Sequence, residues 1–77
     1  MSSIKEKVID ILNEYGGAID ISELDLKYQG ALITNVILTP ENEIQFWSGN
    51  PELKHSAEII LDKEITNYIY DLIIESF

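Results

Sequence analysis

The chain has 77 residues and no cysteine, which excludes disulfide bonds and thiolate metal sites as sources of stability. Hydrophobic residues make up 45% of the sequence and charged residues 25%, a composition typical of a folded globular protein. Fourteen acidic residues against five lysines and no arginine give a net charge of −9, which disfavours direct binding to nucleic acid and to anionic membranes.

The first predicted element is a helix that begins at Ser3 and ends at about Tyr15. Ser3 and Glu6 have the spacing of a capping box, which satisfies free backbone N–H groups at a helix start. Apolar residues then recur at intervals of three and four and share one side of the helix: Ile4, Val8, Ile11, Leu12 and Tyr15. Gly16-Gly17 ends the helix, because glycine readily adopts the left-handed conformation common there.

The next segment alternates apolar and polar residues as a strand does, but the phase of the alternation changes part-way. Residues 18–21 and 24–28 alternate in opposite phase, so Ser22-Glu23 has to absorb a shift of one residue. A β-bulge or tight corner would do this, and a short helical turn is the alternative. Gln29-Gly30 fits a hairpin tip before residues 31–39, the longest β-branched run, which we predict to be the central strand.

A three-residue hairpin loop is predicted over residues 39–43, because Pro40 suits the first turn position and Asn42 tolerates the left-handed one. The chain then returns as a strand from Glu43 to Ser48. This loop sets a register in which Leu38 lies opposite Ile44 and Val36 lies opposite Phe46, on one side of the sheet, with Ile33, Ile37 and Trp47 on the other. Both sides of the sheet are therefore expected to carry apolar groups.

Gly49-Asn50-Pro51 is expected to end this strand, and the chain through His55 is expected to be loop. Residues 57–61 form either a fourth short strand, which we favour, or the first turn of the last helix. Asp62 and Glu64 resemble a helix N-terminus, so this helix should run from about residue 63 to about residue 76. The order of elements predicts one α+β domain, residues 1–77, with an antiparallel β-meander of three or four strands bracketed by an N-terminal and a C-terminal α-helix.

The apolar side of the last helix is wider than one packing partner requires. At about 100° per residue it sweeps roughly 240°, against the roughly 100° needed to face one core. Its members are Ile65, Tyr68, Ile69, Tyr70, Leu72, Ile73, Ile74 and Phe77. In one interpretation the first helix and the sheet bury this arc within the chain. In the other, Tyr70, Ile74 and Phe77 form an intermolecular surface, and Trp47 is either covered by a helix or presented to a partner.

Residues suited to chemistry are few. His55 is the only histidine, and although Glu52 is close in sequence, a general base also needs a nucleophile or a positioned substrate. Oxygen ligands cluster at Asp20, Ser22, Glu23 and Asp25, but their spacing does not match a calcium loop. Gly16-Gly17 follows a helix, whereas a phosphate-binding loop follows a strand. We therefore predict no catalytic, cofactor-binding or metal-binding residue.

The sequence favours a non-catalytic interaction module that associates with itself, most simply as a homodimer, because a small chain without covalent cross-links carries surplus apolar surface. The alternative is an acidic adaptor or inhibitor that binds a basic protein surface, and a small enzyme ranks third. No export signal and no apolar stretch of ~18 residues is present, so we expect a cytoplasmic protein that does not span a membrane.

Overall fold

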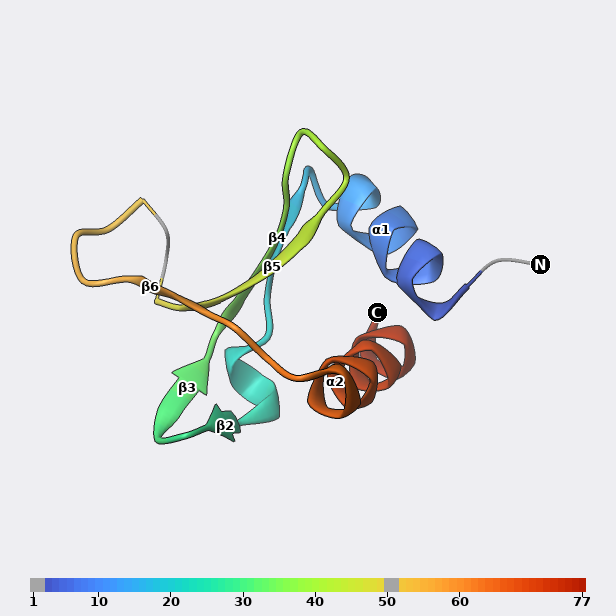
Figure 1. The fold of residues 1–77 in the computed structure, drawn as a ribbon. Coiled ribbons are helices and arrows are strands. Elements are labelled where there is room, and N and C mark those ends of the chain that lie inside the picture. Colours follow the sequence, from blue (N-terminus) through green and yellow to red (C-terminus); the bar gives the residue numbers. More distant parts are fainter. Residues whose placement is uncertain (1–2, 50–51) are drawn as a thin grey trace.

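The computed structural model describes residues 3–49 and 52–77, and within them it confirms the α+β fold. Two α-helices, one near each end of the chain, pack on an antiparallel sheet (Figure 1). The helices are α1 (Ile4–Glu14) and α2 (Lys63–Ser76), and the strands are β1 (Ala18–Asp20), β2 (Leu26–Tyr28), β3 (Ala31–Ile33), β4 (Asn35–Leu38), β5 (Ile44–Ser48) and β6 (Ala57–Ile59). Four strands form one sheet in the order β1-β4-β5-β6, and β2 pairs with β3.

Both ends of α1 lie at the predicted residues, although only the Ser3 half of the predicted capping box is formed. The Ser3 side chain accepts a hydrogen bond from the Glu6 N–H at 3.1 Å. At the other end, the Gly17 N–H donates to the Leu12 carbonyl at 2.7 Å, and φ is +80° at Gly16 and +95° at Gly17. These left-handed values explain why glycines stand at the turn from α1 into β1.

The first two strand pairs are parts of one interrupted antiparallel pairing. Leu26 lies opposite Ile33, and the next pair along is Asp20 opposite Asn35. The chain between Ile21 and Leu26 therefore leaves the ladder, and its residues Ser22–Leu24 form a 3₁₀ helix. Of the two alternatives for Ser22-Glu23, the short helical turn is the one found.

The predicted central strand, residues 31–39, is divided at Thr34. The Thr34 N–H donates to the Trp47 carbonyl at 2.9 Å, although Trp47 is paired with Asn35. Two residues thus oppose one, which is a β-bulge and reverses the alternation of side chains along the strand. As a result Ile33 is buried in the core together with Val36. The prediction that Ile33 shares a side with Ile37 and Trp47 is therefore wrong.

The β4–β5 hairpin has the predicted register, with Leu38 opposite Ile44 and Val36 opposite Phe46. Asn42 has the expected left-handed backbone, with φ of +62°. The favoured fourth strand is also present, since β6 pairs with β5. Asp62 then caps α2 by accepting from the Ile65 N–H at 2.9 Å. In the predicted turn Gly49-Asn50-Pro51, the last two residues lie outside the described residues.

The core lies between the sheet and the two helices. It contains residues from α1, α2 and the strands, together with Ile21: Val8, Leu12, Ile19, Ile21, Ile33, Val36, Phe46, Ile69, Tyr70 and Ile73. An ion pair of 3.4 Å between Lys5 Nζ and Glu43 Oε2 joins α1 to the β4–β5 loop. Neither described helix combines the length and the apolar character that crossing a membrane requires.

Candidate functional site

The side of the four-stranded sheet that points away from the core is the candidate site, and we call it the outer face. The core residues Ile19, Val36 and Phe46 all point to the side that faces α1 and α2. Figure 1 shows both helices on that same side of β4 and β5. Because side chains alternate along a strand, the neighbouring residues point the other way, where no described helix covers them.

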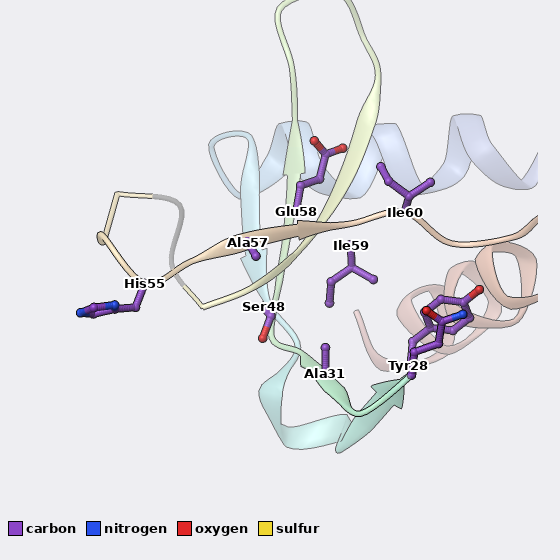
Figure 2. Close-up of a pocket in the computed structure, with 9 residues that line it drawn as sticks. Tyr28, Ala31, Ser48, His55, Ala57, Glu58, Ile59 and Ile60 are labelled. Atoms are coloured by element: carbon purple, nitrogen blue, oxygen red, sulfur yellow. The ribbon is translucent and has the colours of Figure 1, made fainter.

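The outer face consists of two rows that cross the strands. One row runs Asp20–Asn35–Trp47–Glu58, and the other runs Ala18–Ile37–Gln45. Ile60 follows β6 at the end of the second row, and 75% of its surface is exposed. Figure 2 shows Glu58 and Ile60 on the same side of β6, with Ile59 on the opposite side. The face thus has three large apolar side chains, at positions 37, 47 and 60, beside Ala18 and among polar and acidic residues.

Trp47 is half-buried on this face, and its orientation is set by a neighbour on the same strand. The indole Nε1 donates a hydrogen bond to Gln45 Oε1 at 3.2 Å. This bond satisfies the only polar atom of the ring and directs the indole along β5. Trp47 is absent from the packed core, so it is presented outward rather than covered by a helix.

Acidic side chains stand at both ends of the Trp47 row. Glu58 lies directly opposite Trp47 on β6, and Asp20 ends the row on β1. The backbone N–H of Ser22 donates to Asp20 Oδ1 at 2.8 Å, and this bond lowers the pKa of Asp20, with a further contribution from the Ser22 side chain. Asp20 is therefore firmly ionised at neutral pH.

The four residues predicted as an interface do not form one surface. Tyr70 is only 7% exposed, because its ring packs beside Phe46 with the ring centroids 5.9 Å apart. Burial, with a smaller contribution from Glu43, raises the pKa of Tyr70. Ile74 is half-buried against the core, whereas Phe77 is 42% exposed. Of the predicted set, Trp47 alone lies on the outer face, and Tyr70 is buried within the chain rather than exposed on its surface.

The wide apolar arc of α2 is mostly buried within the chain. Its buried members face the core, and Ile65 and Ile74 pack against its margin. Phe77 contacts Tyr15, the residue that follows α1, edge to face, with ring centroids 5.5 Å apart. Tyr68 is the exception within the helix, since it is 57% exposed. The intramolecular interpretation of the arc therefore accounts for most of its residues.

A cavity of about 440 Å³ lies between β6 and the β2–β3 hairpin (Figure 2). Ile59 and Ala31 point toward one another across it, whereas His55 points away and Glu58 lies on the other side of β6. The side chains of His55 and Glu58 therefore do not meet in the cavity.

The acidic residues suggested as a cation site lie around the 3₁₀ turn, where Asp20 accepts from Ser22 and Asp25 has φ of +52°. Within residues 3–49 and 52–77, no three side chains of His, Cys, Asp or Glu are grouped so that they could hold a metal ion.

Comparisons with protein-family models, with curated proteins and with solved structures found no match to this chain.

Proposed function

We propose that this chain is a non-catalytic protein-interaction module that binds another polypeptide on its outer face. The observation that carries this proposal is the position of Trp47, a half-buried aromatic side chain on the side of the sheet that both helices leave open. Aromatic anchors surrounded by polar residues contribute much of the binding energy in protein interfaces. A cytoplasmic location is part of the same proposal.

The composition of the outer face supports this proposal. Ile37, Trp47 and Ile60 supply apolar surface that binding would remove from water, at roughly 25 cal/mol per Å². Polar residues surround them and can stay hydrated at the margin of an interface: Asp20, Asn35, Gln45 and Glu58.

Site-specific photo-crosslinking in the native cells tests the proposal. A photo-reactive amino acid in place of Ile60 is expected to give a discrete adduct with one other polypeptide. The matched control replaces Tyr68, which is 57% exposed but lies on α2. Adducts from both positions, or from neither, would contradict a binding site on the outer face.

Self-association is a second candidate, and the apolar residues of the outer face favour it because a two-fold pairing would bury them on both copies. Light scattering after size exclusion should then give about twice the chain mass of 8.8 kDa. Two chains of net charge −9 repel each other, so the dimer should strengthen as salt rises. Replacing Trp47→Gln should return the monomer with the fold intact, and a monomer at every salt concentration would remove this candidate.

A further inference from the structure

We infer that the partner on the outer face is a cationic segment of another protein, with a lysine or arginine side chain over the indole of Trp47 and paired with Glu58. This inference rests on the proposed function of the outer face and names the chemistry of its partner. Three features carry it: the charge of the face, the orientation of the indole, and the cross-strand position of Glu58.

The outer face is acidic and has no compensating cation. Asp20 and Glu58 stand at the two ends of the Trp47 row, and none of the strands β1, β4, β5 and β6 contains a lysine or arginine. The hydrogen bond from Ser22 lowers the pKa of Asp20 and so further favours its ionised form. Because the whole chain also carries a net charge of −9, this face attracts a basic segment and repels an acidic one.

Glu58 is held close to Trp47 by the hydrogen-bonding pattern of the sheet. The backbone N–H of Thr39 donates to the Glu43 carbonyl, and that of Thr34 donates to the Trp47 carbonyl. The backbone hydrogen-bonding groups of Trp47 therefore face β4 and not β6. Trp47 and Glu58 are therefore a non-hydrogen-bonded pair, whose Cα atoms lie only about 4.5 Å apart. The side chains of Glu58 and Trp47 therefore leave adjacent strands from neighbouring positions on the outer face.

The indole is suited to binding a cation over its face because the N–H on its edge already has a hydrogen-bond acceptor within the chain. Its Nε1 donates to Gln45, so a ligand need not replace a hydrogen bond to water. A cation within about 6 Å of the ring centroid is attracted by the ring, and tryptophan is the strongest side chain in this respect. One guanidinium or ammonium group can therefore contact the ring and the Glu58 carboxylate together.

A second copy of this chain fits the face less well than a basic segment does. Pairing two outer faces would bring two copies of Asp20 and two of Glu58 into one interface, and each chain already carries a charge of −9. Like charges in such an interface oppose association. Electrostatic complementarity therefore favours the cationic partner.

Titration of the chain with hexa-arginine tests this inference, with hexa-citrulline as the neutral control of the same shape. Because Trp47 is the only tryptophan, its fluorescence and its indole N–H resonance report on the outer face directly. Hexa-arginine should shift both signals, with an affinity that falls as salt rises, and hexa-citrulline should not.

Two variants with the same net charge distinguish binding at a defined site from non-specific electrostatic attraction to the acidic chain. Glu58→Gln should weaken hexa-arginine binding about two- to fivefold. Glu14→Gln makes the same change in net charge on α1, on the other side of the sheet, and should leave the affinity close to that of the wild type. Both positions are exposed, so both variants are expected to fold. Equal effects of the two substitutions would overturn the inference.

The remaining outcomes are also decisive. A discrete crosslink at position 60 without any response to hexa-arginine would keep the proposed function and overturn the cationic partner. A doubled mass without peptide, together with no response to hexa-arginine, would assign the face to a second copy and overturn it as well. A response to hexa-arginine that depends on Glu58, without a crosslink in cells, would keep the chemistry of the face and contradict the proposed protein partner.

Discussion

The side chain of Thr34 accepts a hydrogen bond from the backbone N–H of Gly49 at 2.8 Å, across 15 residues of chain. Its hydroxyl also donates to Asn35 Oδ1 at 2.7 Å, and its N–H donates to the Trp47 carbonyl. Thr34 thus lies between the end of β3 and the start of β4. Its hydroxyl also binds the backbone N–H of Gly49, the residue that follows β5. The burial of Ile33 on the same side of the sheet as Val36 depends on this arrangement.

Replacing Thr34→Val should lower the free energy of unfolding by about 1–3 kcal/mol, because the half-buried N–H of Gly49 loses its acceptor. Chemical denaturation measures this loss. Thr34→Ser is the matched control, since it keeps the hydroxyl, and it should retain most of the stability. Equal stability of the valine variant and the wild type would show that the hydroxyl does not support the bulge.

The tip of the β2–β3 hairpin should accept a stabilising substitution. Gln29 and Gly30 both have positive φ, at +51° and +84°, which is the pattern of a type I′ turn. Asparagine tolerates this conformation better than glutamine, so Gln29→Asn should raise the free energy of unfolding by about 0.5 kcal/mol. Thermal unfolding checks it. Gly30→Ala should act in the opposite direction, and a gain there would contradict the turn assignment.

The stability of the chain should depend on Tyr70 at alkaline pH. Burial raises the pKa of Tyr70, so folding favours its neutral, protonated form. This contribution is complete below the pKa of the unfolded chain, about 10, and is lost as the pH rises through the higher pKa of the folded state. Tyr70→Phe cannot ionise at this position, so its stability should fall less than that of the wild type above pH 10. Identical losses in the two proteins would exclude this role.

Asp20 should show the opposite pH dependence. Its pKa is lowered by the N–H of Ser22, so folding favours the ionised carboxylate. The contribution is present above the pKa of the unfolded chain, about 3.9, and is lost as the pH falls through the lower pKa of the folded state. A carbon-13 NMR titration of the Asp20 carboxyl should therefore have its midpoint below 3.9. Ser22→Ala removes the smaller, side-chain contribution but keeps the backbone donor, so the midpoint should rise only part of the way toward 3.9.

Local signals predicted the ends of the elements well. The caps at Ser3 and Asp62 and the Gly16-Gly17 turn each depend on a few adjacent residues, and these residues behave as their types do elsewhere. The β4–β5 register also followed from its loop. In each case the physical cause lies within about five residues of the feature, so it can be read from the sequence.

The bulge at Thr34 could not be predicted in this way. Threonine is a good strand residue, and its neighbours continue a β-branched run, so nothing local marks the break. The cause lies across the sheet, in the carbonyl of Trp47 and the N–H of Gly49. A prediction that lacks the bulge at Thr34 assigns Ile33 to the wrong side of the sheet.

The candidate site was only partly accessible from the sequence. Strand alternation placed Trp47 away from Val36 and Phe46, and the structure places it there. The angular position of Tyr70 on α2 could not show that Phe46 would cover it. Ile60 was missed because the side it points to is defined only once β6 is fixed as a strand, after which the alternation with Glu58 would have identified it.

The acidic ends of the Trp47 row have a second effect, on the tendency of the sheet to grow. β1 and β6 are its two outermost strands, and each presents unpaired backbone groups to any neighbouring molecule. Asp20 lies on one of them and Glu58 on the other, so molecules that stacked strand against strand would bring carboxylates together at each junction. The same charges that would attract a basic ligand thereby oppose polymerisation into fibrils, which allows an aromatic surface to stay exposed at high protein concentration.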